Sequence, residues 1–209
     1  MTDKMTAAEA RARWSIAPEP SEVARGADGA LTRETWALPA EEAFLDAFLR
    51  DVFENHWEGV RFGPIIEGAA YEWKCPTPPR SISLYDGYLT VMFGTGGHFH
   101  LCIGENAGSE GFPTPPALRA RRKPSKAQLF RGYGRDGKPV IWGFEMWNGD
   151  KEPMISIFFP NPFIEDDDSL SDAPDFSRLA TWRAIAQTWL GRAPEAIDAQ
   201  GAGFRDAAH

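Results

Sequence analysis

The chain has 209 residues, of which 43% are apolar, 25% charged and 12% aromatic. This composition is typical of a globular protein with one domain or two small ones, and it excludes a chain that is wholly disordered, collagen-like or coiled coil. The formal net charge of −8 argues against general nucleic-acid binding, because that function needs an excess of cationic side chains for the phosphates.

The sequence carries no targeting or membrane signal that we recognise. The first thirty residues are charged throughout and contain no apolar run that could form the core of a signal peptide. No window approaches the roughly 18 to 20 apolar residues of a membrane-spanning helix. Cys75 and Cys102 are the only cysteines, so we expect two thiols in a reducing compartment. The sequence thus predicts a cytoplasmic protein that does not enter membranes.

Residues 1–35 are rich in Ala, Glu, Arg and Pro and predict a loosely attached arm with one short helix, Ala7–Trp14. An amphipathic helix is expected over about residues 39–54, because apolar residues recur there at spacings of three and four. The following segment is broken by Gly and Pro, and only a strand near residues 65–73 is expected in it. The apolar positions of the helix are Phe44, Leu45, Phe48, Leu49, Val52 and Phe53.

Two hairpins follow. The Asp-Gly pair at residues 86–87 lies between two β-favouring runs, which predicts a two-residue turn. This turn sets Tyr85 opposite Tyr88, Ser83 opposite Thr90 and Ile82 opposite Val91, and it places Ile82, Leu84, Leu89, Val91 and Phe93 on the core face. Residues 98–102 continue as a third strand after Gly94–Gly97.

The second hairpin pairs residues 140–147 with residues 152–159. A four-residue loop at 148–151 sets Phe144 against Ile155 and Trp142 against Ile157. A two-residue Asn-Gly turn would instead oppose Glu145 to Glu152, and like charges across a strand pair are unfavourable.

A C-terminal amphipathic helix is expected over residues 176–190, with Asp175 near its start and Gly191 just beyond its end. Hairpins that are flanked by helices, rather than alternating with them, predict an α+β fold with an antiparallel sheet of about five or six strands. We assign residues 1–35 to the arm, 36–192 to a single α+β domain packed against both helices, and 193–209 to a C-terminal tail. The C-terminal helix has the apolar stripe Leu179, Trp182, Ile185, Ala186 and Trp189.

The strand at residues 98–102 carries the candidate site. His98, His100 and Cys102 alternate along it, so their side chains project from one face, with Glu105 just beyond the strand end. Two imidazoles at this spacing can reach one divalent metal, but a further ligand is needed. Two His with a carboxylate would suit iron, whereas an added thiol would favour zinc. The candidates for the further ligand are Glu105, Cys102, Cys75, Glu72 and Glu145.

The face that these histidines occupy depends on the turn at Gly94–Gly97. If Phe93 opposes His98, the imidazoles join the apolar face; a three-residue turn moves them to the face of Tyr88, Thr90 and Met92. The alternative to a metal site is a pair of structural histidines that form hydrogen bonds within the sheet.

Residues 119–138 form a basic segment, with eight Lys or Arg against the single acid Asp136. Arg119, Arg121 and Arg122 are candidates for binding an anionic molecule, because a guanidinium can bind a carboxylate or phosphate bidentately. The alternative is a solvated face, paired with the acidic run at residues 165–168, or a docking surface for an acidic protein.

The segment GGHFHLCIGE at residues 96–105 resembles the core of an uncharacterised family of bacterial hypothetical proteins. The likeness continues at residues 115–119, 121–122, 127–131, 139–143, 147–149 and 159–163, roughly the middle half of the chain. The resemblance implies a bacterial origin and a single recurring domain, and it implies no catalytic role.

Three functions fit these residues. The first is a small metal-binding protein or metal-dependent enzyme, with His98 and His100 binding Fe or Zn, Glu105 or Cys102 completing the site, and a small anionic substrate near Arg121 and Arg122. The second is a non-enzymatic binding protein with structural histidines and the basic segment as its docking surface. The third is a metal-free enzyme that uses one histidine as general base. No Gly-rich phosphate loop, Gly-x-Ser-x-Gly, His-Glu-x-x-His or Cys-x-x-Cys motif occurs.

Overall fold

The computed structural model describes residues 5–204 of the protein. Within them, seven strands form a large antiparallel sheet in the order β1-β2-β12-β13-β14-β3-β6, and a second sheet has the order β7-β8-β9. The fold is therefore α+β with antiparallel sheets, as the hairpins predict, although the large sheet exceeds the expected five or six strands. The strands of the large sheet are β1 (Glu22–Arg25), β2 (Leu31–Leu38), β12 (Pro124–Tyr133), β13 (Pro139–Asn148), β14 (Pro153–Phe158), β3 (Arg61–Gly63) and β6 (Trp73–Lys74).

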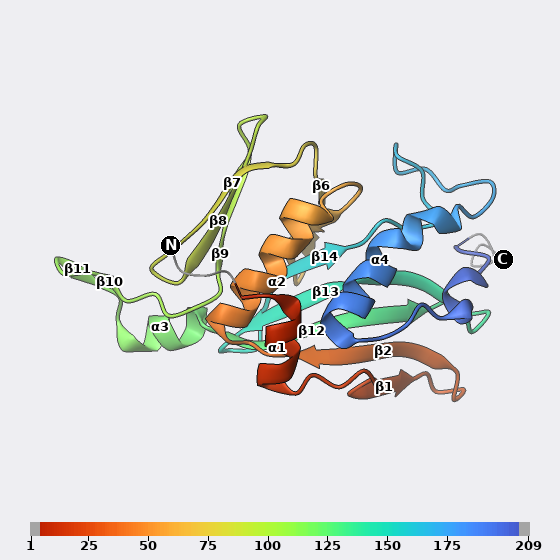
Figure 1. Ribbon diagram of the computed structural model, residues 1–209, viewed down its shortest axis with the longest axis horizontal. Helices are drawn as coiled ribbons and strands as arrows, with labels where there is room; N and C mark the ends of the chain where they lie inside the picture. The colour runs from red at the N-terminus through yellow and green to blue at the C-terminus, as the bar shows by residue number, and fades with distance from the viewer. Residues whose placement is uncertain (1–4, 205–209) are drawn as a thin grey trace.

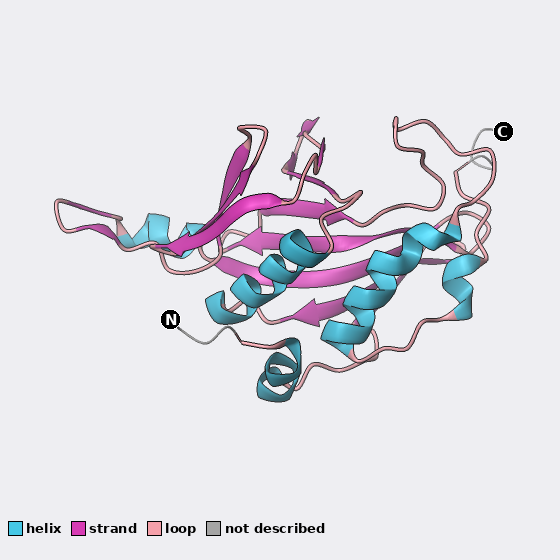
Figure 2. Cartoon of the chain, turned by 45° about the horizontal axis from the view of Figure 1, so that its top comes forward, coloured by secondary structure: helices cyan, strands magenta, loops and turns pink. Residues whose placement is uncertain are grey.

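The three longest helical segments lie on one face of the large sheet (Figures 1 and 2). They are α1 (Ala7–Trp14), α2 (Glu42–Asn55) and a C-terminal helix in which α4 (Ala180–Ile185) is preceded by a 3-10 turn and followed by a π turn that ends at Leu190. None of them covers the opposite face of the sheet.

The three-stranded sheet stands beside one end of the large sheet (Figure 1). Its strands are β7 (Pro79–Tyr85), β8 (Tyr88–Phe93) and β9 (His98–Cys102). Beyond it lie the short helix α3 (Pro116–Arg122) and the hairpin of β10 (Gly108–Ser109) and β11 (Phe112–Pro113), and a further hairpin is formed by β4 (Ile65–Ile66) and β5 (Ala69–Ala70). In the part of the chain that the structure describes, no helix is long and apolar enough to cross a membrane.

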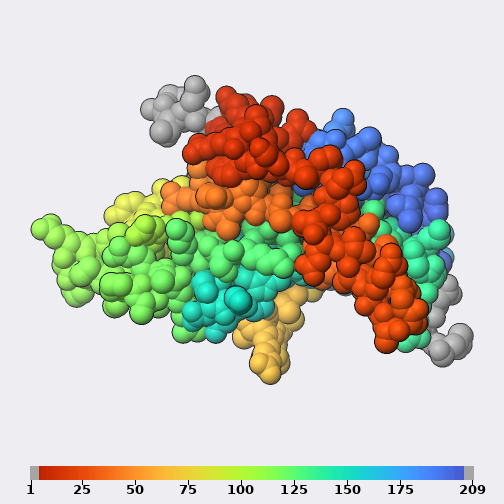
Figure 3. Space-filling model, turned by 90° about the horizontal axis from the view of Figure 1, so that it is seen from below, coloured from red at the N-terminus to blue at the C-terminus, as the bar shows by residue number. Residues whose placement is uncertain are grey.

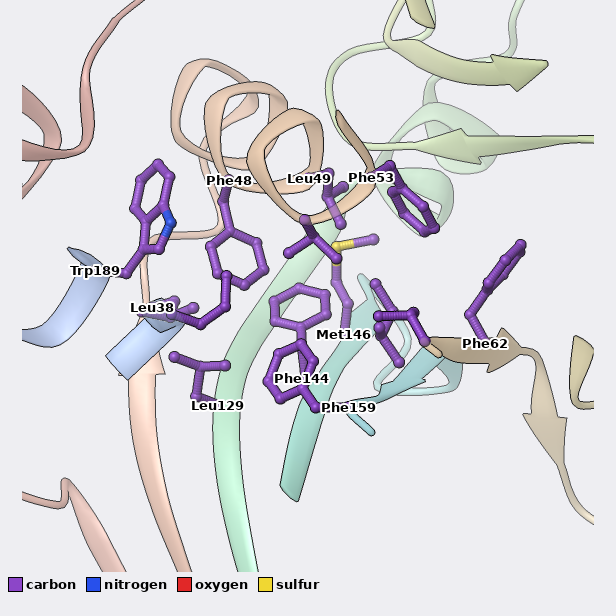
Figure 4. Packing of buried hydrophobic residues seen from close by; sticks show 14 of the residues in the cluster. Leu38, Phe48, Leu49, Phe53, Phe62, Leu129, Phe144, Met146, Phe159 and Trp189 are labelled. Carbon is purple, nitrogen blue, oxygen red and sulfur yellow. The ribbon is translucent and has the colours of Figure 1, made fainter. Parts of the chain in front are cut away.

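The core lies between the helices and the large sheet (Figure 4). All six apolar residues predicted for the α2 stripe are fully buried. The ring of Phe48 contacts Phe144 of β13 at a centroid distance of 4.9 Å and Trp189 of the C-terminal helix at 5.3 Å. Aromatic side chains bury a large area each, so these contacts hold both amphipathic helices on the sheet.

The first predicted hairpin is confirmed. Tyr85 pairs with Tyr88, Ser83 with Thr90 and Ile82 with Val91, and the turn residues Asp86 and Gly87 have φ values of 46° and 76°, which a two-residue hairpin turn requires.

The second hairpin exists, but its predicted register is wrong by two residues. Phe144 pairs with Ile157 rather than Ile155. Trp147 pairs with Pro153 rather than with the expected Glu152, which shifts the register by one residue, and a bulge between Met146 and Trp147 shifts it by the second. The side-chain oxygen of Asn148 accepts hydrogen bonds from the backbone N–H of Asp150 (3.0 Å) and Glu152 (2.9 Å) and shapes the turn. A shift of two residues keeps each side chain on its face, so the core prediction survives.

Residues 1–35 are not a loose arm where the structure describes them. The predicted helix Ala7–Trp14 packs on the core, with Ala10 fully buried and Trp14 against Phe44 at 5.4 Å. Residues 22–38 form β1 and β2, and β2 pairs with β12 inside the large sheet. Residues 31–38 show no clear alternation of apolar and polar side chains, so the strand depends on its pairing with β1 and β12.

The C-terminal segment is also anchored up to residue 204. Asp198, in a 3-10 turn (Ala196–Ala199), is 2% exposed. Its carboxylate accepts hydrogen bonds from the indole N–H of Trp142 (2.9 Å) and Trp182 (3.1 Å) and from Arg131 (3.0 Å). Burial alone would lower the pKa of Arg131, but the neighbouring Asp198 and Glu34 raise it above its ordinary value. The last predicted tail residues, 205–209, lie outside the described part.

Candidate ligand-binding site

His98 and His100 lie on β9, which is the edge strand of the three-stranded sheet. Met92 of β8 pairs with His98, and Thr90 pairs with His100. The loop between the strands, residues 93–97, therefore places both imidazoles on the face of Tyr88, Thr90 and Met92. This is the second of the two predicted faces, although the loop has five residues and not the three that were expected. Both histidines are exposed, so they are not part of the dry core.

The two imidazole rings are close together, and of the two only His100 forms a side-chain hydrogen bond among the described residues. Their centroids are 5.1 Å apart and their planes are nearly perpendicular, at 75°. The Nδ1 atom of His100 forms a hydrogen bond of 2.7 Å with the hydroxyl of Thr90. When Nδ1 carries the proton and donates it, Nε2 keeps its lone pair and is available to a ligand.

A pocket of about 660 Å³ opens beside these rings, between β9 and the end of the large sheet that holds β14, β3 and β6. This volume lies in the range of small-molecule sites. No Asp, Glu, Cys, Lys or Arg lines the pocket among the described residues. Its lining consists of His98, His100 and the aromatic or apolar side chains Phe62, Tyr71, Trp73, Phe99, Leu101, Met154 and Ile155, with Gly63, Pro64, Thr95 and Gly97.

An aromatic cluster supports this pocket from the core side. Phe99, between the two histidines, projects to the opposite face of β9 and packs on Phe53 (5.3 Å) and Phe62 (4.9 Å). Trp73 in turn contacts Phe62 at 5.6 Å and Phe93 at 4.9 Å. Because these rings are packed on one another, the wall of the pocket is preformed rather than assembled on binding.

Trp73 packs closely on Gly97 of the β8–β9 loop. A Cβ atom at Gly97 would lie 3.0 Å from the Trp73 ring, so a larger side chain at this position would push into the pocket wall.

The expected third metal ligands do not join the histidines. The thiol of Cys102 is buried and donates to the carbonyl oxygen of Gly104 at 3.5 Å, and burial raises its pKa. The carboxylate of Glu105 pairs with Arg119 at 3.0 Å. Across residues 5–204, no group of three or more His, Cys, Asp or Glu side chains is placed to hold a metal ion.

The remaining candidate ligands lie elsewhere. Cys75 is buried, its thiol donates to the carbonyl oxygen of Thr77, and burial raises its pKa to about 12. Glu145 pairs with Arg33 at 2.6 Å on the face of the large sheet that the helices leave open. Glu72 is exposed and does not line the pocket.

The basic segment is not one surface. Arg119 and Arg121 on α3 pair with acids, Arg121 with Glu152 (3.0 Å) and Asp150 (3.3 Å). Arg122 donates to the side-chain oxygen of Asn106 at 2.7 Å. The acidic run at residues 165–168 does not pair with this segment as expected; its partners are Arg61, Lys74 and Arg178.

The sequence identified the two histidines but missed the pocket. Phe62, Tyr71 and Trp73 lie in the Gly- and Pro-broken segment where the sequence predicts only one strand, and Met154 lies on the second strand of the second hairpin. No local pattern brings these residues to β9, because the contact depends on how the two sheets meet.

The family of the chain follows from a match over residues 22–191 to the Family of unknown function (DUF7676). The chain belongs to this family. No curated protein matches this DUF7676 chain.

Three solved structures are similar over about three quarters of the chain. A crystal structure of ChuX shares 13% identity, covering 76% of this chain and 78% of that one, at a TM-score of 0.49. A structure described as the heme-binding protein ChuX shares 15% identity, covering 74% and 76%, at a TM-score of 0.45. A protein from Erwinia carotovora shares 13% identity, covering 75% of each chain, at a TM-score of 0.46. With similarities this low, no residue of the pocket takes a role from them.

Proposed function

We propose that the pocket beside β9 binds a flat, largely apolar small molecule that carries its own metal ion, of the iron-porphyrin class, and that His98 or His100 supplies an axial ligand to that metal. The observation that carries the proposal is the pair of exposed imidazoles at the mouth of an aromatic pocket without a third protein ligand.

The set of donor groups favours a metal that arrives inside an organic complex. A bare Zn²⁺ or Fe²⁺ ion needs at least three protein ligands to be held firmly, and the described residues offer two imidazoles. A porphyrin already occupies four positions on its iron and leaves only axial positions, which a histidine or methionine side chain fills. Two imidazoles, with Met154 in the same pocket, match this smaller demand.

The lining of the pocket supports the same class of ligand. The walls present the rings of Phe62, Tyr71 and Trp73, and flat aromatic ligands gain from packing against such surfaces. Acids, thiols and amines are absent from the described lining residues, so the imidazoles of His98 and His100 are its nitrogen donors for a metal.

Of the two histidines, His100 is better prepared to act as a ligand. Its hydrogen bond to Thr90 holds the ring, and the tautomer in which Nδ1 donates leaves Nε2 free, which is the arrangement that metal-binding histidines commonly show. His98 has no such partner among the described residues.

Three probes added to the purified full chain test the proposal: ferric iron protoporphyrin IX, metal-free protoporphyrin IX and Zn²⁺ alone. We expect the iron porphyrin to saturate at one equivalent, the metal-free porphyrin to bind at least about tenfold more weakly because the axial bond is lost, and Zn²⁺ to bind weakly. Tight stoichiometric Zn²⁺ would show a metal-ion site instead. Equal affinities for the two porphyrins would show that the histidines do not bind the iron. If neither porphyrin binds, the proposed function is refuted.

A further inference from the structure

The open face of the large sheet carries a polar hollow that the pocket beside β9 does not use. Side chains alternate along each strand, so Thr35 of β2, Gln128 of β12 and Glu145 of β13 project from the face opposite the helices. Gln128 and Glu145 are directly paired across the strands. In the view from below, the helices lie along the upper side, and the β4–β5 hairpin and the β1–β2 hairpin project downward from this open side (Figure 3).

The hollow has a volume of about 310 Å³, and Arg33, Thr35, Lys126, Gln128, Glu145 and Trp147 line it. It shares no lining residue with the His98 and His100 pocket. It is therefore a separate feature, and whatever it binds is independent of the ligand proposed above.

Polar groups in this hollow have unused hydrogen-bonding capacity. Thr35 is 6% exposed and Gln128 is 5% exposed, yet the Thr35 hydroxyl has no hydrogen-bond partner among the described residues. Gln128 donates to Glu145 at 3.3 Å, while its carbonyl oxygen accepts nothing from them. The Nε atom of Arg33 is buried without a partner, although its Nη2 reaches Glu145 at 2.6 Å. Buried polar groups are normally satisfied, and of these atoms Arg33 Nε is the one that is fully buried without a partner among the described residues. The side chains of Thr35 and Gln128 line the hollow, where their unused oxygen atoms can bind a ligand or ordered water.

The charges of the hollow are balanced. The two cationic side chains, Arg33 and Lys126, are balanced by two anionic ones, Glu145 and Glu22. A charged ligand of either sign would therefore be repelled by some of these groups, which favours a neutral ligand. The unused groups include both donors and acceptors, and a hydroxyl group can satisfy either. The indole ring of Trp147 adds an apolar surface to the hollow. The Lys126 ammonium lies 5.0 Å from the centroid of this ring.

From these observations we infer that the hollow is a second binding site, for a neutral polyhydroxylated molecule of the monosaccharide class. Such a ligand presents ring hydroxyls to Thr35, Gln128 and Arg33, and its C–H face packs on Trp147. A volume of about 310 Å³ is at the small end of ligand sites and suits one sugar ring.

The test is ligand-observed NMR on the full chain with glucose, galactose, mannose and N-acetylglucosamine as probes, each titrated to about 50 mM, the weak end of specific binding. We expect saturable binding of at least one sugar. Trp147→Ala and the near-isosteric Thr35→Val are expected to raise its Kd by about tenfold or more, whereas Tyr85→Ala, an exposed tyrosine on the small sheet, leaves it within about twofold. Thr35→Val conserves volume and β-branching, so it tests the hydroxyl in a folded chain.

Three results would overturn the inference. The first is no saturable binding of any of the four sugars, and the second is binding that neither variant weakens. A third is a dimer, detected by light scattering, that Trp147→Ala dissociates, because a second copy would then cover the hollow. None of these outcomes depends on porphyrin binding, so the two proposals fail separately.

Discussion

Replacing Thr90 by valine tests how His100 is prepared for a metal. Valine has nearly the shape of threonine but lacks the hydroxyl that bonds His100 Nδ1 at 2.7 Å. Partners of this kind orient a metal-binding imidazole, and losing one typically costs about 10- to 100-fold in affinity, or roughly 1.4–2.8 kcal/mol. The same hydrogen bond lies at an exposed pair, and one such bond contributes only about 0.5–1.5 kcal/mol to stability. Ligand affinity is therefore expected to fall further than stability.

The assay is a titration with ferric iron protoporphyrin IX, followed by its absorption spectrum, together with urea unfolding of the same samples. Thr90→Ser restores the hydroxyl and is expected to recover most of the affinity. A Thr90→Val chain that binds the iron porphyrin as the unchanged chain does would refute the role of this hydrogen bond. Weaker binding that Thr90→Ser fails to rescue would do the same.

Three further predictions concern the core, the pocket wall and a thiol. Asp198→Ala removes the carboxylate that two indole N–H groups and a buried guanidinium share as acceptor, so the free energy of unfolding in urea should fall by about 3–5 kcal/mol. The control Asp150→Ala, at an exposed position, should leave this free energy nearly unchanged. Equal effects of the two substitutions would contradict the anchoring role of Asp198. Gly97→Val places a side chain against the Trp73 ring, which lies 3.0 Å from the Cβ position. The substitution should weaken porphyrin binding although both histidines are intact. A porphyrin titration identical to that of the unchanged chain would disprove this prediction. Burial raises the pKa of the Cys75 thiol to about 12, so hardly any reactive thiolate exists at pH 8. Alkylation of Cys75, monitored by mass spectrometry, should therefore be slow until urea exposes the residue. Rapid alkylation of the folded chain would contradict this prediction.

Local patterns sufficed for the elements whose signals are strong. The apolar spacing of α2 and the Asp86-Gly87 turn each predict one structure with little competition, and both are found. The helix Ala7–Trp14 was also predicted within its observed bounds, since its sequence ends before Pro18.

Long-range pairing was harder to predict. Residues 31–38 have no clear alternation of apolar and polar residues, and they form a strand that pairs with β12 in the large sheet. The bulge beside Trp147 adjoins a turn whose backbone N–H groups donate to the Asn148 side-chain oxygen, and a count of loop residues does not reveal either feature.

The candidate site was predicted in part. Alternation along β9 correctly placed His98 and His100 on one face, but the expected contribution of Glu105 failed because Arg119 pairs with that carboxylate. The pocket itself depends on Phe62 and Trp73, which reach β9 only when the two sheets meet.

The most direct test of the central claim compares the affinity of the chain for ferric iron protoporphyrin IX with that of a His98→Ala, His100→Ala variant. His56→Ala is the matched control, because His56 lies at the end of α2, near Asp51, and does not line the pocket. We predict one saturable site in the unchanged chain and in His56→Ala, and a loss of at least about 100-fold in the double variant, for two axial candidates removed. Binding by the double variant within about twofold of the unchanged chain would contradict the assignment of His98 and His100 as ligands.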